Sequence, residues 1–310
     1  MYRMRELFYK LLFKIFVRDK LKRKFLTRCL SKVGIIKYFQ LRRLVKEEAF
    51  KEPKFKYNIA MTCIAKNEGD YFREWIEYHK LIGVEHFYVY NNNTEDNTKE
   101  ILQEYINKGL VTWIDWPEVS KNAQDNAYRD AVAKFKNETR WMAVIDLDEF
   151  MVLKKHKSLS EFMKDYKDYA QISLQWVTYG SSGHKKKPEG LVLENFKAHA
   201  KEPEITPKSI FNPRVTVDCG AHWMYVCGPW VDEDKKDYFG SEKNKVNIAQ
   251  VNHYVIKSEE EFYHRKAPKG CVDADQQKFK DLAKFFADSD KNDVVDDLMI
   301  RYVEKLKKVL

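Results

Sequence analysis

Long apolar segments are missing from this sequence of 310 residues. No apolar run approaches the roughly 20 residues that a helix needs to span a bilayer, so a polytopic membrane protein is excluded. The five cysteines are odd in number and show no C-x-x-C spacing, which disfavours a zinc site or a disulfide framework. We therefore expect reduced thiols in a cytosolic protein. The N-terminus also lacks the smooth apolar region and small-residue cleavage site of a signal peptide.

Glycine-rich phosphate-binding loops are absent as well. The sequence contains neither G-x-G-x-x-G nor G-x-x-x-x-G-K-[ST], the motifs of dinucleotide-binding and P-loop proteins. An NAD-dependent dehydrogenase and a P-loop NTPase are therefore disfavoured. A nucleotide diphosphate bound without such a loop needs another source of positive charge, which a metal ion can supply.

The net charge of +9 is concentrated at one end of the chain. Residues 1–50 hold 15 Lys/Arg and 4 Asp/Glu, whereas the other 260 residues hold 41 and 43. This asymmetry separates a basic segment of net charge +11 from a slightly acidic part of net charge −2. We expect a helical extension over residues 1–50, a linker over 51–56 and a globular domain over 57–310.

The basic extension is amphipathic. A second segment, residues 25–45, repeats the mixture of apolar and basic side chains found in residues 5–17. Such helices can lie on an anionic membrane surface, or can pack their apolar side on the rest of the protein; both interpretations stay open. The apolar residues at helical spacing in the first segment are Phe8, Leu11, Leu12, Ile15 and Phe16, and Lys10, Lys14 and Arg18 occupy other faces.

Strands and helices alternate between residues 57 and 145, which predicts an α/β fold with a mostly parallel sheet. In such sheets ligands bind at the carboxyl ends of the strands. Three of the four expected strand ends are polar, at residues 66–68, 91–94 and 146–149. The expected strands are 58–65, 86–90, 111–116 and 141–145, and the expected helices are 71–81, 98–108 and 122–135.

The second half of the sequence is less regular. We expect strands at residues 170–176, 209–218, 222–226 and 246–256. A loop follows the first of these strands and contains three successive lysines. The C-terminal stretch, residues 273–310, has a helical pattern throughout.

Asp146-Leu147-Asp148 is the sharpest chemical feature. Alternate residues at the end of a strand point the same way, so the two carboxylates are expected to converge just after the buried run 141–145. Carboxylates so close repel one another, and a divalent cation such as Mn²⁺ or Mg²⁺ relieves that repulsion while bridging to a diphosphate. The competing interpretation is a cluster at a helix N-cap, a position that Asp favours.

Several ordered motifs resemble the glycosyltransferase family 2/family 92 group. They are Ile64-Ala65-Lys66-Asn67-Glu68, residues 74–79, residues 81–94, and Asp146-Leu147-Asp148-Glu149-Phe150. Trp176 with residues 179–184, and Asn252-His253-Tyr254, resemble later segments of the group. The resemblance spans about residues 57–305.

The resemblance implies a GT-A (Rossmann-like) fold and a metal-dependent hexosyltransferase-type enzyme that uses a nucleotide-diphosphate sugar, for which a UDP-sugar is one candidate. Asp146, Asp148 and His253 would bind the metal, and Trp176, His184 and His222 would contact sugar or acceptor. Without the resemblance, His253 is more simply a core histidine on a strand. The nucleotide-sugar would contact Ala65, Lys66, Asn67, Glu68, Asn91, Asn93, Gln124, Asn126 and Asp146. Related enzymes often carry an acid where this chain has Asn91, although an amide can still bind a base or ribose.

An inverting reaction, which the resemblance favours, needs a carboxylate that deprotonates the acceptor hydroxyl. The base is not identified, and Glu189, Asp218 and Asp232 are weak candidates that also fit solvated surface charges. The acceptor would be a glycan or a lipid-linked glycan in surface polysaccharide, capsule or lipopolysaccharide synthesis. We expect a peripheral protein at the cytoplasmic face of the membrane, held there by residues 1–50.

Two other classes stay open. A sugar-phosphate nucleotidyltransferase also uses carboxylates and a metal on an α/β sheet, but its glycine-rich, lysine-containing loop is missing here. A nucleic-acid-binding protein would fit the sequence pI near 9.0. The net charge of −2 beyond residue 50 argues against it, because only the basic extension could bind nucleic acid.

Overall fold

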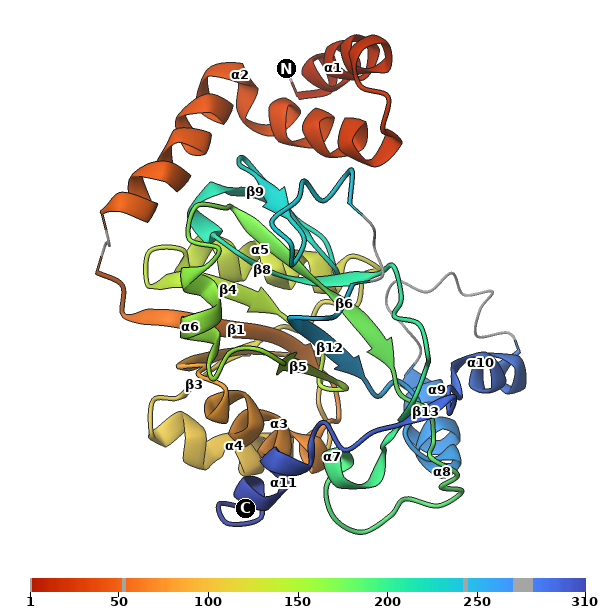
Figure 1. The fold of residues 1–310 in the computed structure, drawn as a ribbon. Helices are drawn as coiled ribbons and strands as arrows, with labels where there is room; N and C mark the ends of the chain where they lie inside the picture. Colours follow the sequence, from red (N-terminus) through yellow and green to blue (C-terminus); the bar gives the residue numbers. More distant parts are fainter. Residues whose placement is uncertain (1, 52–53, 242–244, 270–280) are drawn as a thin grey trace.

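The computed structural model describes residues 2–51, 54–241, 245–269 and 281–310, and a nine-stranded sheet forms its centre (Figure 1). The strand order is β3-β2-β1-β4-β8-β6-β12-β5, with β11 beside β6. The strands are β1 (Tyr57–Ala65), β2 (His86–Asn91), β3 (Val111–Asp115), β4 (Thr139–Val144), β5 (Glu149–Leu153), β6 (Gln171–Thr178), β8 (Pro207–Phe211), β11 (Trp230–Val231) and β12 (Ala249–His253).

The first half of the sheet confirms the predicted α/β class. Strands β3, β2, β1 and β4 are mutually parallel, and β1 is apolar and buried along most of its length because the sheet is covered on both faces. The register pairs Ala65 with Asn91, so β1 and β2 end at the same level. The helices between these strands are α3 (Gly69–Leu81), α4 (Thr98–Asn107) and α5 (Ala123–Phe135).

The second half departs from the prediction at two places. The expected strand 209–218 is interrupted after β8, because Pro213 has no backbone N–H for a sheet and Asn212 caps a short 3₁₀ turn with its side chain. Strand β9 (Thr216–Cys219) then starts a separate hairpin with β10 (Met224–Val226). Strand β5, which the sequence pattern did not predict, pairs antiparallel with β12.

The C-terminal stretch is not helical throughout. Strand β13 (Val294–Val295) lies between two helices in the chain and consists of two β-branched residues. It pairs antiparallel with β7 (Ala198–His199). Residues 273–280 of the predicted helix lie outside the described residues. The remaining helical elements are α6 (Leu159–Lys164), α7 (Val192–Asn195), α8 (Glu259–Glu261), a π-helix η2 (Phe262–Lys266), α9 (Ala267–Lys269), α10 (Leu282–Ser289) and α11 (Ile300–Leu306).

The basic N-terminal segment forms two helices, α1 (Tyr2–Phe16) and α2 (Lys20–Phe50), which we call the arm. Figure 1 shows the arm beside β9, on the side of the sheet away from α3 and α4. Helix α2 packs on the rest of the chain, the body, through Phe25, whose ring lies 5.3 Å from that of Trp230. The packing interpretation therefore holds for α2. In the described part of the chain, no helix combines the length and apolarity that a membrane crossing requires.

Candidate active site

Asp146, Leu147 and Asp148 occupy a tight turn between β4 and β5. The prediction that both carboxylates point the same way assumed extended backbone, and the turn replaces it. Asp146 accepts a hydrogen bond from Gln124 at 3.0 Å and pairs with the Nζ of Lys208 at 2.9 Å. Asp148 instead pairs with the Nζ of Lys266 at 2.7 Å. The D-x-D sequence thus gives each carboxylate its own cationic partner.

Lys208 is a fully buried cation at the centre of this arrangement. Its Nζ lies 2.9 Å from Asp146, 3.4 Å from Glu149 and 3.1 Å from the carbonyl oxygen of Ala221. Burial alone would lower the pKa of Lys208, but Asp146 and Glu149 raise it above its ordinary value, so the side chain stays charged. Sequence reasoning missed this residue because no motif distinguishes it.

Among the described residues, Asp148, Glu149 and His253 form a group that could hold a metal ion. One ligand atom from each lies within 4.8 Å of the others. The antiparallel register pairs His253 of β12 with Glu149 of β5, which explains the proximity. One carboxylate oxygen of Glu149, Oε1, is buried and has no hydrogen-bond partner among the described residues. Two carboxylates and an imidazole with a free, buried oxygen fit Mn²⁺. Asp146, predicted as a ligand, is not part of this group.

The protonation of these three side chains follows from burial and neighbouring charge. Burial would raise the pKa of Asp148, but Lys266 and His253 hold that pKa well below its usual range. Burial raises the pKa of Glu149 to about 8, although Lys208 opposes the shift. Burial lowers the pKa of His253 to about 4, so its imidazole is neutral near pH 7, the form that can bind a metal.

Aromatic side chains form a wall beside this group. The ring of Trp176, on β6, lies 4.3 Å from that of His253 and 5.2 Å from that of His222. Burial and the charge of Lys208 lower the pKa of His222 to about 4. The structure therefore brings Trp176, His222 and His253 together. His184 lies apart from them, with its ring against Phe196.

The residues predicted to contact the nucleotide lie at the ends of β1 and β2. The side chain of Asn91 donates to Asp115 at 3.0 Å and accepts from the backbone N–H of Thr94 at 3.0 Å. Asn67 and Asn93 have left-handed backbone angles, with φ of 53° and 55°, which Asn tolerates better than most residues. Ala65 is buried and Lys66 is exposed.

Two other predicted nucleotide contacts have protein partners. Glu68 forms an ion pair with Arg265 of η2. Asn126 donates a hydrogen bond to Glu118 at 2.8 Å, and Gln124 contacts Asp146 as described above. Gln124, predicted as a nucleotide contact, thus lies beside Asp146, and the ion pair of Glu68 with Arg265 was not predicted.

The π-helix η2 supplies cations that sequence reasoning missed. Lys266 reaches Asp148, and the guanidinium of Arg265 lies 3.8 Å from the centre of the Tyr71 ring. Burial and the charge of Arg265 lower the pKa of the nearby Lys257 to about 8. π-Helical turns often occur at functional sites. The only sequence signal was the basic run His264-Arg265-Lys266.

The three candidate bases have other environments. Asp218 is buried and pairs with Arg129 at 2.6 Å, and Asp232 caps a turn by accepting backbone hydrogen bonds from residues 234 and 236. Glu189 is exposed. Glu204, which sequence reasoning missed, is an exposed carboxylate beside the aromatic wall: its backbone N–H donates to the carbonyl of Trp176 at 2.8 Å.

Comparisons with known proteins match this chain to a family. The model of glycosyltransferase family 92 matches residues 60–299. A family 92 protein of Ricinus communis is 26% identical over 223 residues, which cover 68% of this chain and 38% of that protein. A family 92 protein of Arabidopsis thaliana is 24% identical over 237 residues, which cover 71% of this chain and 40% of that protein. The chain thus spans 40% or less of the length of these two relatives.

More distant matches have narrower coverage or weaker structural likeness. A galactan beta-1,4-galactosyltransferase of A. thaliana is 25% identical over 117 residues, which cover 35% of this chain and 23% of that protein. The solved structure of GalNAc-T7 with UDP, GalNAc and Mn²⁺ matches with a TM-score of 0.38 and 11% identity, over 81% of this chain and 57% of that one. Staphylococcus aureus TarS 1–349 in complex with UDP matches with a TM-score of 0.34 and 13% identity, over 51% and 47% of the two chains.

Proposed function

Because the chain belongs to glycosyltransferase family 92, we propose that it transfers a sugar from a nucleotide-diphosphate donor to a hydroxyl of a glycan or lipid-linked acceptor. The observation that carries the proposal is the group formed by Asp148, Glu149 and His253 beside Trp176. It lies where parallel strands end, the usual place for ligands on an α/β sheet. Family membership favours this reaction over the nucleotidyltransferase and nucleic-acid alternatives.

Asp148 and His253, with Glu149, would hold a divalent metal, Mn²⁺ or Mg²⁺. When bound, the metal would neutralise charge that develops on the departing diphosphate. The chain contributes cations of its own around the same carboxylates. Lys266 and Arg265 come from η2, and Lys208 holds Asp146 in place. Asp146 would then act through a contact to the ribose rather than as a metal ligand.

The nucleoside would lie over the ends of β1 and β2, near Ala65, Asn67 and Asn91, and a UDP-sugar is the donor we favour. Trp176 would present its flat face to a sugar ring. Glu204, exposed beside Trp176, is the carboxylate we propose as the base of an inverting transfer. A Glu204→Gln variant should keep donor binding and lose turnover. If turnover were unchanged, another group would be the base.

Exposed apolar residues of the arm support a position at the membrane. Met4, Leu7, Phe8, Leu11 and Ile15 each expose more than half of their surface. They recur on one face of α1, opposite the side packed on α2. We propose that this face rests on the cytoplasmic surface of the membrane, where a lipid-linked acceptor would lie. Surface-polysaccharide, capsule or lipopolysaccharide synthesis remains the predicted setting.

The proposed reaction is tested by release of the nucleotide from a panel of nucleotide sugars, with Mn²⁺ and with chelator. Asp148→Ala should lower Mn²⁺-dependent turnover on the order of 100-fold or more, since it removes stabilisation of the developing charge. Asp165→Ala is the matched control, because Asp165 is an exposed partner of His156 on the surface. Unchanged turnover and metal dependence in Asp148→Ala would contradict the assignment.

A further inference from the structure

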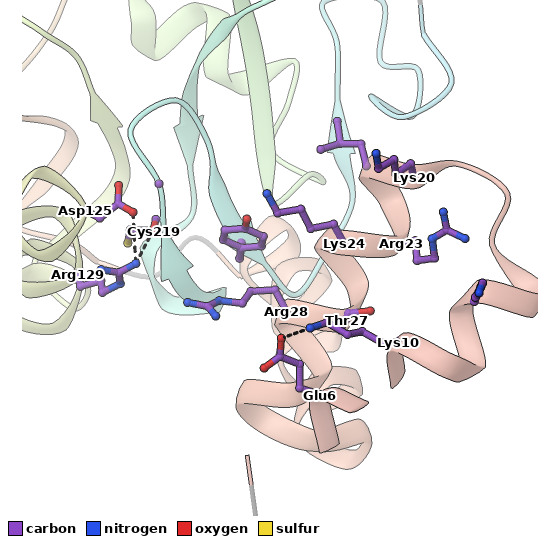
Figure 2. A pocket seen from close by; sticks show the side chains of 14 residues that line it. Glu6, Lys10, Lys20, Arg23, Lys24, Thr27, Arg28, Asp125, Arg129 and Cys219 are labelled. Carbon is purple, nitrogen blue, oxygen red and sulfur yellow. Dashed lines mark hydrogen bonds and ion pairs between the residues drawn. The ribbon is translucent and has the colours of Figure 1, made fainter. Parts of the chain in front are cut away.

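A cavity of about 880 Å³ lies between the arm and the body, apart from the carboxylate group described above. Its walls come from α1, α2, α5 and the turn between β9 and β10. Figure 2 shows Lys24 and Arg28 extending from α2 toward the side on which α5 carries Arg129. The volume is in the range of sites for small molecules, roughly 300–1,000 Å³.

The lining of this cavity is strongly basic. Seven of its 14 residues are Lys or Arg, and two are acidic. In the parts of the chain that the structure describes, Lys14, Lys20, Arg23 and Lys24 have no ion-pair or hydrogen-bond partner through their side chains. Unpaired cations gathered around one cavity favour an anionic ligand, because each brings a charge that no protein carboxylate neutralises.

A buried carboxylate, Asp218, pairs with two of the cations that line the cavity. Asp218 is 3% exposed and pairs with Arg28 of the arm and with Arg129 of α5, the latter at 2.6 Å. Lys32 adds a third cation at 3.7 Å. Asp125 also pairs with Arg129, at 3.4 Å, so three cations face two carboxylates and a net positive charge remains. The ion pairs also fix Arg28 and Arg129 in place, so a ligand would meet guanidinium groups that are already ordered.

The cavity is also amphipathic. Leu21 and the ring of Tyr225 contribute apolar surface to its lining. Lys10 and Lys14, one turn apart on α1, line the cavity and lie between the buried side of this helix and its exposed apolar face. The basic lining is therefore continuous with a surface suited to a bilayer. A phosphate group at a bilayer surface offers a negative charge to the basic lining and lies next to acyl chains that suit the apolar face of α1.

Two segments connect the cavity to the candidate active site. Helix α5 directs Gln124 to Asp146 and contributes the next residue, Asp125, to the cavity. The turn after β9 contributes Gly220 to the cavity, and its neighbour Ala221 accepts a hydrogen bond from Lys208. A molecule whose phosphate lies in the cavity would thus contact the same two segments that carry Gln124 and Ala221 to the site of transfer.

We propose that this cavity binds the phosphate headgroup of a lipid and so positions a lipid-linked acceptor. The acceptor role rests on the proposed glycosyltransferase function, whereas the binding of a lipid phosphate does not. The cationic side chains of both arm helices and of α5 would contact the phosphate oxygens, and the apolar face of α1 would lie among the acyl chains. Free inorganic phosphate shares the charge but not the apolar part.

The proposal is tested with the full chain and a soluble short-chain phosphatidic acid as the probe, by the shift in melting temperature. The test variant is Lys14→Glu/Lys24→Glu, which reverses one charge on each arm helix across the cavity. The control is Lys37→Glu/Lys46→Glu, which makes the same change in net charge at exposed positions of α2 outside the cavity. We expect the probe to bind the test variant at least about tenfold more weakly than the control.

If both variants bound the probe equally weakly, the cavity would not be the binding site, because only the general attraction between a basic protein and an anionic lipid would explain binding. A shift of equal size with inorganic phosphate would overturn the lipid part, since the acyl chains would then contribute nothing. Binding of UDP with Mn²⁺, measured in the same way, separates the two proposals. Failure of UDP to bind the unmodified protein contradicts the proposed function and leaves the lipid-phosphate result standing on its own.

Discussion

At the carboxylate group Lys208 is fully buried and pairs with Asp146 and Glu149, whereas on the arm Lys14 and Lys24 are exposed and pair with no residue that the structure describes. Both regions gather cations, but only the first encloses them. A buried charge is tolerated only when it is neutralised and hydrogen-bonded. An exposed charge costs little to leave unpaired and remains available to a ligand. The comparison separates cations that hold the protein together from cations that can bind something else.

The largest effect is expected from removing the buried cation. Lys208→Met leaves the buried Glu149 and the partly exposed Asp146 without their cationic partner, and should lower the free energy of unfolding by about 4 kcal/mol. Lys24→Met, on the arm, should change it by less than about 0.5 kcal/mol. Denaturant unfolding of both variants measures the difference. Similar values for the two would remove the distinction between the two groups of cations.

The arm itself has an inner and an outer side, which phenylalanine substitutions distinguish. Phe25 is 2% exposed and packs against Tyr225 and Trp230, whereas Phe8 is 59% exposed. Phe25→Ala should lower the free energy of unfolding by about 3 kcal/mol. Phe8→Ala should leave it nearly unchanged and weaken binding to anionic vesicles in a sedimentation assay. A large loss of stability in Phe8→Ala would contradict an outward-facing α1.

Lys266 offers a test of how paired cations at the site affect metal binding. Its ammonium lies 2.7 Å from Asp148 and would repel a divalent ion held by the same carboxylate. Lys266→Ala should therefore tighten Mn²⁺ binding in the absence of donor by about tenfold, equivalent to about 1.4 kcal/mol. Isothermal titration calorimetry measures the change, with Lys24→Ala as control. Weaker Mn²⁺ binding in Lys266→Ala would show that Lys266 supports the metal site.

The last test changes the pH rather than a cation and concerns a buried histidine with no charged partner. Burial lowers the pKa of His79 to about 3, and its ring contacts the backbone carbonyl of Trp75 and the N–H of Met151. The unfolded chain takes up this proton below about pH 6.5 and the folded chain does not, so the free energy of unfolding falls as the pH drops below 6.5, by up to about 1.4 kcal/mol per pH unit.

Unfolding measured between pH 7 and pH 4.5 should therefore show a shallower loss in His79→Gln than in the unmodified protein. The arm contains no histidine, so the arm variant Lys24→Met should keep the original slope. An unchanged slope in His79→Gln would mean that the His79 ring takes up its proton in the folded state as well.

The sequence predicts the parts of the structure that have a regular hydrophobic pattern better than the parts that do not. The alternation of residues 57–145 predicts the parallel half of the sheet, because each strand there is buried and bounded by turns. Asp148 and His253 were predicted as neighbours through family resemblance, and the structure brings them together. Lys208 and Lys266 were not predicted at the site, because they reach the carboxylates from segments without periodic patterns. The breaks at residues 213 and 294–295 depend on local turn chemistry that hydrophobic periodicity does not capture.

Gly34 determines the course of the arm. Its φ of +76° lies in the left-handed region, where α2 changes direction within what would otherwise be one helix of 31 residues. The Arg5 guanidinium of α1 lies 3.4 Å from where a side-chain carbon of residue 34 would be. A single methyl group at residue 34 would therefore strain the bend through this backbone angle, while its contact with Arg5 would be an ordinary one. The orientation of the apolar face of α1 therefore depends on residue 34 having no side chain.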